Sequence, residues 1–490
     1  MLTVLSTQML YHICRIFASL EQKGARLPLP PGSRQRKPRI FYGDQQNHMN
    51  SGRIAPSARL NALLRPLPLV ALALSAVVAL RQSYRAHRSV SENHPPDETP
   101  LPTPPPHVSI ILPVRNEEAT IDACLASLLA QDYPDFDITI IDDGSTDATP
   151  RLLAEWRARD ERIRVRRIDC LPGGWAGKAH ALHTGVTLTR GEWLLFTDAD
   201  TFHAQQTLRL LVGYALHRQD DLLSMSTNLM TISGPAMPLL MPITEILLAQ
   251  RVTPAEVRDP ASPRAFAFGQ YILLRRKSYL ATGGYTAAGI RSTSIDDLAL
   301  AEQFKQYGQR IEVVNGRGLV MNRQWTTWKS ARLGWRKSLY GEIFRSYIPL
   351  TALLAALAFI AYGLGPLFVL LYTLHSGKVR RFSTLLAGIT LVAQIDAKRC
   401  FDREYELILP WSLTAPAGWV ACGLLALDVA RLILTGQRAD WKGRQLPKQE
   451  VAFPQSHRDI LSALLSSINS LSHDGGISSG VWEEMEGDTV

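Results

Sequence analysis

Short apolar segments alternate with longer amphipathic segments between residues 107 and 345. The short segments are rich in β-branched residues, and the longer ones repeat their apolar positions at helical spacing. This pattern predicts strands at 108–112, 138–141, 163–168 and 193–197, and helices at 121–130, 149–159 and 179–188. Strand–helix alternation favours a mostly parallel sheet covered by helices, an α/β fold. Because ligands of such sheets bind at the carboxyl ends of the strands, the polar residues that follow each strand are the first candidates for a site.

Long uncharged stretches outside this region predict membrane segments. The stretch 66–80 is short against the ~20 residues that span a bilayer, so its flanking arginines would have to snorkel. The stretches 346–377, 382–395 and 407–427 allow three or four further crossings. The first of these is too long for one crossing and short for two, and its central Gly363-Leu364-Gly365-Pro366 favours a re-entrant hairpin.

These patterns divide the chain into six parts. Seven prolines between residues 95 and 106 indicate a stiff, extended linker before the α/β region. We predict a basic, disordered region at 1–66, a membrane segment at 67–80, a linker at 81–106, a catalytic domain at 107–345, a membrane region at 346–435, and a cytosolic segment with an acidic, flexible tail at 436–490.

Composition narrows the class of protein. A hydrophobic content of 46% and a charged content of 20% are ordinary for a folded chain. The net charge of +9 is uneven, because residues 1–66 are strongly basic and residues 451–490 are acidic. The middle is near neutral, which gives no support to nucleic-acid binding, whereas a basic tract beside an apolar segment suits a surface of anionic lipid. The five scattered cysteines form neither a metal spacing nor a disulfide framework.

Two polar motifs directly follow the first two predicted strands. The first runs from Pro113 to Glu118 and includes Arg115 and Glu117, and the second begins with Asp142-Asp143-Gly144. Carboxylates at a strand end accept hydrogen bonds from a base or from ribose hydroxyls. Each motif is also explained without a ligand, the first as a helix cap and the second as an Asp-Gly turn.

Three later motifs add phosphate, metal and base chemistry. The glycine-rich loop 171–178 ends in Lys178 at a helix start and suits a phosphate, although an ordinary turn has the same composition. Asp198 and Asp200 follow an apolar strand at a spacing that suits Mg²⁺ or Mn²⁺, with a solvated loop as the alternative. Asp296 and Asp297 open a helix, where a carboxylate is either a general base or a helix cap.

The five motifs in this order resemble those of the family 2 glycosyltransferases, over about residues 107–345. Phe196 to Thr201, the Gly-Trp-x-Gly-Lys loop and the late Trp441-Lys442-Gly443-Arg444 are similar to the membrane-bound subgroup that glycosylates hopanoids, carotenoids and other lipids. The resemblance implies a GT-A type, Rossmann-like nucleotide-sugar-binding domain. It also implies an inverting transfer from a nucleotide sugar, such as a UDP-sugar, to a hydroxyl or carboxylate of a lipid acceptor.

The resemblance also implies a role for each motif residue. Asp297 matches the general base, Asp200 with Asp198 matches the ligands of Mg²⁺ or Mn²⁺, and Lys178 lies near the diphosphate. Arg323 lies near the phosphates, and Trp325 closes over the diphosphate or acceptor. The remaining nucleotide-sugar-binding residues are Pro113, Arg115, Glu117, Asp142 and Asp143, and Asp198 also approaches the ribose.

Three other classes of protein remain as alternatives. A sugar-nucleotide pyrophosphorylase would carry a Gly-x-Gly-Thr-Arg loop near the first strand, which the sequence lacks. A processive polysaccharide synthase would carry Gln-x-x-Arg-Trp where this chain has Arg323-Gln324-Trp325. A degenerate, non-catalytic membrane protein would not need the aspartates at 198, 200 and 297.

Because nucleotide sugars are cytosolic, residues 107–345 are expected on the cytoplasmic side of the inner (plasma) membrane, in a multi-pass protein. With a hairpin at 346–377, six basic residues of the C-terminal region fall inside and three outside, which the positive-inside rule favours. This topology places Trp441 to Arg444 in the cytosol, on the active-site side.

Overall fold

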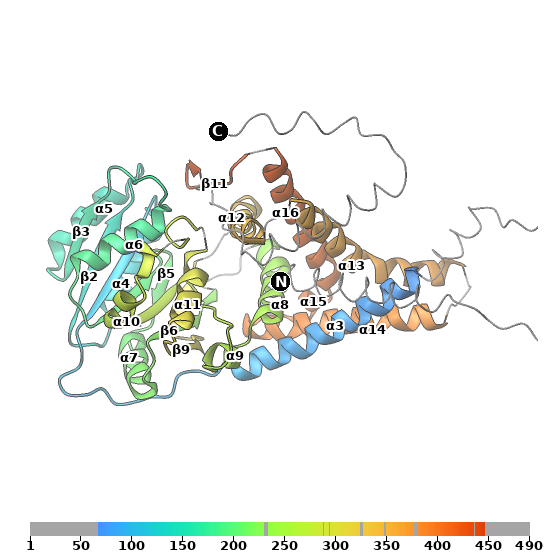
Figure 1. Cartoon of the computed structure of the whole chain (residues 1–490), viewed down its shortest axis with the longest axis horizontal. Coiled ribbons are helices and arrows are strands. Elements are labelled where there is room, and N and C mark those ends of the chain that lie inside the picture. The colour runs from blue at the N-terminus through green and yellow to red at the C-terminus, as the bar shows by residue number, and fades with distance from the viewer. Residues whose placement is uncertain are drawn as a thin grey trace, which may run out of the picture. The chain divides into compact units, whose positions relative to one another are not determined.

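The structure is a computed structural model of the 490-residue chain (Figure 1). It describes residues 67–229, 234–287, 289–293, 295–323, 327–346, 349–376, 381–435 and 437–445, without the side chains of residue 229 and residues 341–352. The region 1–66, residues 446–490 of the predicted C-terminal segment and tail, and Trp325 lie outside the described residues.

A seven-stranded sheet forms the centre of the α/β domain, in the order β3-β2-β1-β4-β8-β6-β9. β8 runs antiparallel to both of its neighbours, β4 and β6, and the other pairings are parallel. The predicted α/β fold with a mostly parallel sheet is therefore confirmed. The strands are β1 (Val108–Val114), β2 (Phe136–Asp142), β3 (Ile163–Arg167), β4 (Trp193–Thr197), β6 (Leu222–Ser226), β8 (Tyr271–Arg275) and β9 (Ile311–Asn315).

Helices cover both faces of this sheet, because alternate residues of each strand point to opposite sides. In β1, Ile110 and Leu112 join one apolar core and Ile111 joins the other, and all three are fully buried. Burying such side chains contributes about 1.5–3 kcal/mol each. The covering helices are α4 (Ile121–Leu129), α5 (Thr149–Arg159), α6 (Gly177–Leu188), α7 (Thr207–Arg218), α10 (Arg276–Ala281), the short η1 (Gly284–Thr286) and α11 (Asp296–Gln306).

A small second sheet extends from the carboxyl edge of the large one. Its order is β5-β10-β7, with β5 (Thr201–His203), β10 (Val320–Asn322) and β7 (Asn228–Leu229). β10 brings the following residue, Arg323, beside the loop after β4, where its backbone N–H donates to the Asp200 carbonyl oxygen at 2.8 Å.

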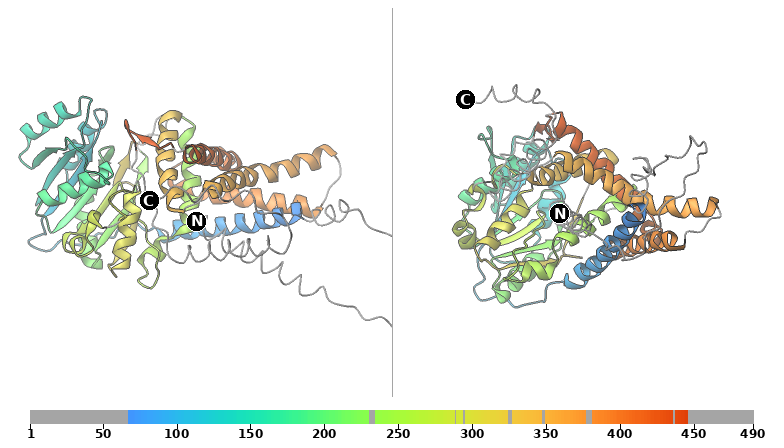
Figure 2. Two further views of the ribbon diagram at one scale, coloured as in Figure 1. Left: turned by 45° about the horizontal axis from the view of Figure 1, so that its top comes forward. Right: turned by 45° about the vertical axis from the view of Figure 1, so that its right-hand side comes forward.

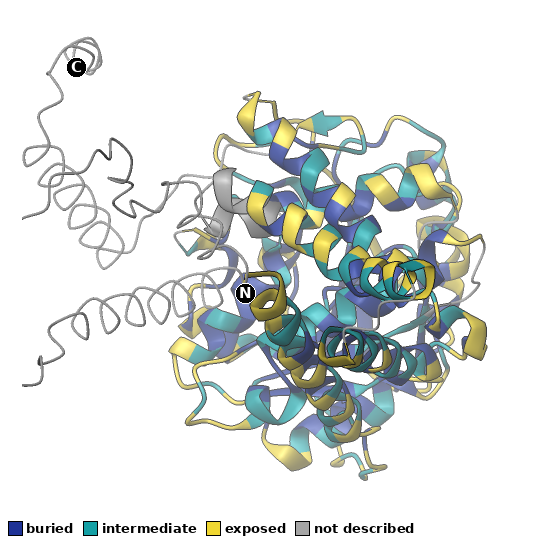
Figure 3. Cartoon of the chain, turned by 90° about the vertical axis from the view of Figure 1, so that its right-hand side faces the viewer, coloured by how far each residue is buried: buried dark blue, intermediate teal, exposed yellow. Residues whose placement is uncertain are grey.

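The remaining helices form a bundle beside the domain (Figures 1 and 2). Three of the described helices contain stretches long and apolar enough to cross a membrane: Leu67–Glu92, Leu353–Ser376 and Ala415–Leu434. Many of their large apolar residues are exposed, such as Val77 and Leu371, as expected for a lipid-facing surface (Figure 3). The bundle comprises α3 (Leu67–Glu92), α8 (Ala236–Arg251), α9 (Pro254–Arg258), α12 (Trp328–Ser346), α13 (Pro349–Ser376), α14 (Arg381–Glu404), α15 (Leu409–Ser412) and α16 (Ala415–Leu434).

Two sequence-based boundaries differ from the structure. α3 continues to Glu92, so the linker does not begin at residue 81; residues 81–92 contain neither proline nor glycine to end the helix. The predicted re-entrant hairpin at 346–377 is wrong, since α13 is one continuous helix with Pro366 inside it.

Of the two glycines that suggested a hairpin, Gly363 serves helix packing instead, as does Gly423 of α16. A Cβ at Gly363 would lie 2.6 Å from the Pro416 carbonyl oxygen, and one at Gly423 would lie 2.8 Å from the Ala356 carbonyl oxygen. Both positions therefore let α13 and α16 approach more closely than any side chain would allow, which is how small residues act between helices in membranes.

Candidate functional site

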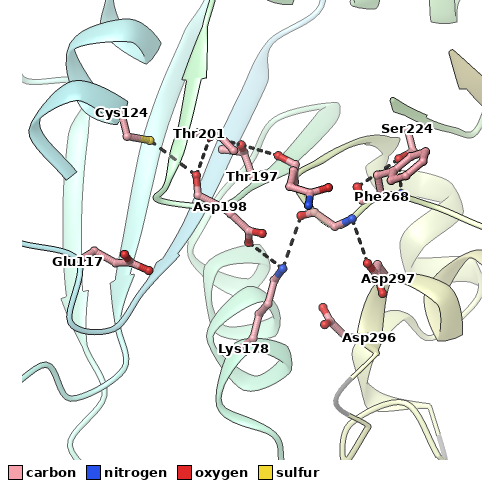
Figure 4. A network of polar contacts seen from close by, with 12 residues as sticks. Glu117, Cys124, Lys178, Thr197, Asp198, Thr201, Ser224, Phe268, Asp296 and Asp297 are labelled. Carbon is pink, nitrogen blue, oxygen red and sulfur yellow. Dashed lines mark hydrogen bonds and ion pairs between the residues drawn. The ribbon is translucent and has the colours of Figure 1, made fainter. Parts of the chain in front are cut away.

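Polar residues from four strand ends meet at the carboxyl edge of the sheet. β1 leads to Glu117, β2 to Asp143, and β4 to Asp198 and Asp200, while the antiparallel β8 starts from this same edge just after Gly269. Lys178 enters from the first turn of α6, and Asp297 from the first turn of α11. The sheet thus collects residues from 117 to 297 in one place (Figure 4).

A polar network joins Lys178 to the acidic residues on two sides. Lys178 Nζ lies 2.7 Å from Asp198 Oδ1 and donates to the Gly269 carbonyl oxygen at 3.5 Å. The Gly269 N–H in turn donates to Asp297 Oδ2 at 3.0 Å. Burial alone would lower the pKa of Lys178, but Asp198, Asp296 and Asp297 together raise that pKa, so the lysine stays protonated.

The two aspartates at the start of α11 have different surroundings. Asp296 accepts a hydrogen bond from the buried Tyr285 hydroxyl at 3.0 Å. Asp297 accepts from two backbone N–H groups, those of Gly269 and Leu298, and its carboxylate lies toward Lys178 (Figure 4). Burial and the neighbouring Asp296 charge raise the pKa of Asp297, which makes its carboxylate a stronger proton acceptor.

Asp200 has the features of an incomplete cation site. Its Oδ1 is buried and contacts no hydrogen-bond donor of the described residues. Burial, together with the charges of Asp198 and Glu117, raises its pKa to about 7. An unpartnered oxygen amid several carboxylates is costly without a cation, so the donor set fits a hard divalent ion such as Mg²⁺ or Mn²⁺.

A C-terminal hairpin lies against the residues that follow β1 and β2. It consists of β11 (Asp440–Trp441), a turn at Lys442 and Gly443, and β12 (Arg444–Gln445). The Lys442 ammonium forms an ion pair with Glu117, and Arg444 Nη1 lies 2.5 Å from Asp143 Oδ2. The sequence predicted the Trp441–Arg444 segment on the active-site side, but it did not predict these two contacts.

The other residues predicted to bind a nucleotide hold the loops that follow β1 and β2. Asp142 is engaged at both oxygens, by the Ser145 N–H at 2.8 Å and by Arg167 Nη1 at 2.7 Å. Arg115 donates to the Asp143 and Lys442 carbonyl oxygens and so joins the β2 loop to the hairpin. Pro113 occupies the next-to-last position of β1, opposite Ile141.

Two further basic residues reach the site from the C-terminal half. Arg323 Nη1 donates to the Ala119 carbonyl oxygen at 2.9 Å, close to the loop that carries Glu117. Lys337 of α12 lies 5.2 Å from the Trp441 ring centroid. Burial and then the charge of Lys178 lower the pKa of Lys337. The sequence analysis missed Lys337; its position two residues after Gly334-Trp335 is the only signal that the sequence offers.

Part of the chain is similar to known proteins. Residues 109–279 match the family described as "Glycosyl transferase family 2". Over 298 residues the chain is 27% identical to a 4,4'-diaponeurosporenoate glycosyltransferase of Staphylococcus aureus (strain USA300). The matched stretch covers 57% of this chain and 70% of that relative.

Solved structures of glycosyltransferases are also similar to the chain. One is the mannosyltransferase PcManGT from Pyrobaculum calidifontis in complex with GDP-Man and Mn²⁺, with 20% identity, a TM-score of 0.44, and coverage of 76% of this chain and 91% of that one. Another is S. aureus TarS 1-349 in complex with UDP-GlcNAc, with 17% identity, a TM-score of 0.34, and coverage of 71% and 98%.

Proposed function

We propose, from the premise that residues 109–279 form a glycosyl transferase family 2 domain, that the protein transfers a sugar from a nucleotide sugar to a lipid or lipid-like acceptor at a membrane. A carotenoid glycosyltransferase among its relatives and three helices apolar enough to span a bilayer support the lipid acceptor. A UDP-sugar is the donor that we infer, and the anomeric configuration inverts.

One observation carries this proposal. Lys178, which pairs with Asp198 on the donor side, is joined through Gly269 to Asp297, which is the proposed base on the acceptor side. A single network therefore brings a cation for the leaving diphosphate next to a carboxylate for the incoming hydroxyl (Figure 4).

The residues then act as follows. Glu117, Asp143 and Arg115 shape the nucleotide side, and Lys178 with Arg323 places positive charge near the departing diphosphate. Asp297 takes the proton of the acceptor hydroxyl as its oxygen attacks the anomeric carbon. A divalent cation held by Asp200 and Asp198 would supply additional stabilisation of the charge that develops on the diphosphate. A direct displacement of this kind needs one carboxylate base and no carboxylate nucleophile.

The test is transfer by the purified full-length protein from labelled nucleotide sugars to extracted membrane lipids. Asp297→Asn should reduce transfer by at least ~10²-fold, the lower range for loss of a general base, while donor affinity changes little. Asp169→Asn is the matched control, because Asp169 is 88% exposed.

An equal loss of donor affinity in Asp297→Asn would show that Asp297 binds the nucleotide sugar rather than the acceptor proton. The lipid extract also separates the alternatives, since a processive synthase yields polymer and a degenerate domain yields no product.

A further inference from the structure

Two threonines and one histidine form a buried cluster behind the candidate site. Thr197 is the last residue of β4, and Thr201 and His203 are the first and last residues of β5. The Oγ1 atoms of the two threonines lie 3.1 Å apart, and His203 Nε2 lies 3.2 Å from the first and 2.9 Å from the second. The three residues are only 1–3% exposed, so they act on the site through the groups that they bind.

Each threonine hydroxyl holds a backbone carbonyl in a different loop. Thr201 Oγ1 donates to the Asp198 carbonyl oxygen at 2.6 Å, in the loop that carries both predicted metal ligands. Thr197 Oγ1 donates to the Gln270 carbonyl oxygen at 2.8 Å, just before β8 (Figure 4). The cluster therefore ties the loop after β4 to the loop before β8.

The loop before β8 is also the one that holds the proposed base. Its Gly269 N–H donates to Asp297 Oδ2 at 3.0 Å. A Cβ at Gly269 would lie 2.8 Å from that oxygen and 3.2 Å from Lys178 Nζ, so the backbone of this loop lies against both side chains. Because Gln270 directly follows Gly269, a bond that fixes the Gln270 carbonyl also limits the movement of Gly269.

The same two loops are joined a second time on the open side of the site. Lys178 Nζ pairs with Asp198 Oδ1 at 2.7 Å and donates to the Gly269 carbonyl oxygen. A diphosphate or a cation that binds there would compete for the lysine or for the aspartate. The buried cluster is out of reach of such ligands, so its connection between the loops persists when the site is occupied.

The number of available protons assigns a role to His203. Each threonine hydroxyl carries one proton, and each donates it to a carbonyl oxygen. Neither hydroxyl has a proton left for its neighbour, so we assign the N–H to His203 Nε2, which donates to the hydroxyl oxygens. Burial lowers the pKa of His203 to about 3, so the ring is neutral at physiological pH. This donor keeps both hydroxyl protons directed at the two carbonyls.

We propose that Thr197, Thr201 and His203 are positioning residues that couple the loop of the metal ligands to the loop that holds Asp297. Cation binding at the first loop and placement of the base at the second then stabilise each other, as linkage requires of two coupled sites. The proposal rests on the function proposed above, and it deepens that function by stating how occupancy of the donor side prepares the acceptor side.

The experiment removes one hydroxyl and then restores it. Thr197→Val keeps the shape of the side chain without the hydroxyl, and Thr197→Ser keeps the hydroxyl. Full-length protein in nanodiscs is titrated with Mn²⁺ by calorimetry, and hydrogen exchange of the peptide that contains Gly269 is followed by mass spectrometry. Mn²⁺ should slow this exchange in the wild type. Thr197→Val should bind Mn²⁺ ~10-fold more weakly, which corresponds to about 1.4 kcal/mol, and should lose the protection. Thr197→Ser should retain both.

The matched control is Thr139→Val. Thr139 is a buried threonine of β2 whose hydroxyl has no partner among the described residues, so this variant should behave as the wild type. Wild-type Mn²⁺ affinity in a folded Thr197→Val, or an equal loss in Thr197→Ser, would overturn the proposal. Exchange at Gly269 that does not respond to Mn²⁺ in the wild type would overturn it without any variant.

A double variant tests whether the two threonines act as one unit. Thr201→Val should also weaken Mn²⁺ binding ~10-fold, and Thr197→Val with Thr201→Val should lose ~10-fold rather than the ~100-fold of independent sites. Losses that multiply would contradict the coupling.

Transfer assays in parallel separate this inference from the proposed function. Thr197→Val should lower the kcat of transfer ~10-fold, and Thr197→Ser should restore it. A wild type without transfer, but with Mn²⁺ protection that Thr197→Val abolishes, would count against the proposed function alone. Normal transfer by Thr197→Val, with wild-type Mn²⁺ affinity, would count against the coupling alone.

Discussion

Asp200 is the residue whose surroundings most require a partner that is not a side chain. Its buried Oδ1 is unpaired among the described residues, and burial with two neighbouring carboxylates raises its pKa to about 7. A bound divalent cation would give the unpaired oxygen a partner and would offset the repulsion between the carboxylates. Metal binding requires the deprotonated carboxylate, so it would also favour the ionised form of Asp200.

Asp200→Asn should therefore lose metal binding and turnover together. We expect at least ~10²-fold lower turnover, comparable to the loss of one electrostatic stabiliser in an active site. Calorimetric titration with Mn²⁺ checks the binding, and transfer assays check the rate, with Asp169→Asn as the control. Wild-type turnover that survives complete chelation would sink the metal hypothesis.

Asp220 gives a separate prediction for pH. It is buried, its Oδ2 has no partner among the described residues, and burial together with the Glu312 charge raises its pKa to about 7. Its ordinary value is near 3.9. Because the folded-state pKa is the higher one, the unfolded chain releases this proton first, and Asp220 costs stability progressively as pH rises from about 4 to 7.

Asp220→Asn removes this titration. The melting temperature of the variant minus that of the wild type should therefore be larger at pH 8 than at pH 5, whatever its value at pH 5. Thermal melts in the two buffers measure it, and Asp169→Asn should show no such trend. A difference that is flat or falls with pH would mean that Asp220 ionises normally in the folded protein.

The β11–β12 hairpin is the element with the clearest effect on the site. Lys442 and Arg444 form ion pairs with Glu117 and Asp143, which would otherwise be uncompensated negative charges facing the proposed donor. The charge of Lys442 also favours a lower pKa of Asp200. Under the proposed function, the hairpin would thus favour both the ionised form of Asp200 and the approach of an anionic donor.

Lys442→Met should accordingly weaken donor binding and metal binding by ~10-fold each, which corresponds to about 1.4 kcal/mol per site. The KM for the donor and the half-saturating Mn²⁺ concentration are the measurements. Arg438→Met alters an exposed arginine just before the hairpin and should leave both unchanged. Tighter donor binding in Lys442→Met would show that the hairpin obstructs the pocket.

Local patterns predicted some elements and missed others for physical reasons. β1 to β4 and the first three helices of the domain followed from local pattern. β1, β2 and β4 are short apolar runs that are buried almost throughout, and the helices repeat their apolar positions at helical spacing. The antiparallel β8 between β4 and β6 did not, because strand order is set by long-range pairing that no local pattern records. α13 was mistaken for a hairpin because Gly363 serves packing against α16, a contact made with residues more than fifty positions away.

The same limit applied to the candidate site. Its acidic residues are adjacent to strand ends and could be found from the sequence, whereas Lys337 and the ion pairs of Lys442 and Arg444 depend on how α12 and the hairpin pack. The two ion pairs join Lys442 to Glu117 and Arg444 to Asp143, residues about three hundred positions apart in the chain.

At the scale of the whole molecule, contacts fix which helix ends share a side with the domain. Asn93, just after α3, contacts Ser226, and Glu404 at the end of α14 contacts Asn315. The hairpin after α16 contacts Glu117. Since such contacts cannot cross a bilayer, we expect α13 to leave the domain side and α14 to return. On this topology α16, although long and apolar enough to span, has both ends on the domain side and is not expected to cross.

This arrangement also suits the distribution of charge. On this topology seven basic residues between positions 378 and 444 are expected on the domain side and three on the far side, so the positive-inside rule favours a cytosolic domain. The expected domain-side set is Lys398, Arg399, Arg403, Arg431, Arg438, Lys442 and Arg444, and the expected far-side set is Lys378, Arg380 and Arg381.

Single cysteines in a background without native cysteines test this topology in intact spheroplasts. Leu413→Cys and Thr435→Cys, at the two ends of α16, should both be protected from an impermeant thiol reagent, and Lys378→Cys should be labelled. Labelling of either α16 end from outside would show that this helix crosses.

The contacts between the domain and the ends of α3 and α14 have a consequence for the fate of the proposed product. Under the proposed function, a lipid acceptor reaches the domain from the leaflet beside these helix ends. A sugar added there makes a head group that would cross the hydrocarbon core only at high cost. The proposed glycolipid would therefore stay in the leaflet in which it is made, and its display on the opposite surface of the cell would depend on a separate lipid flippase.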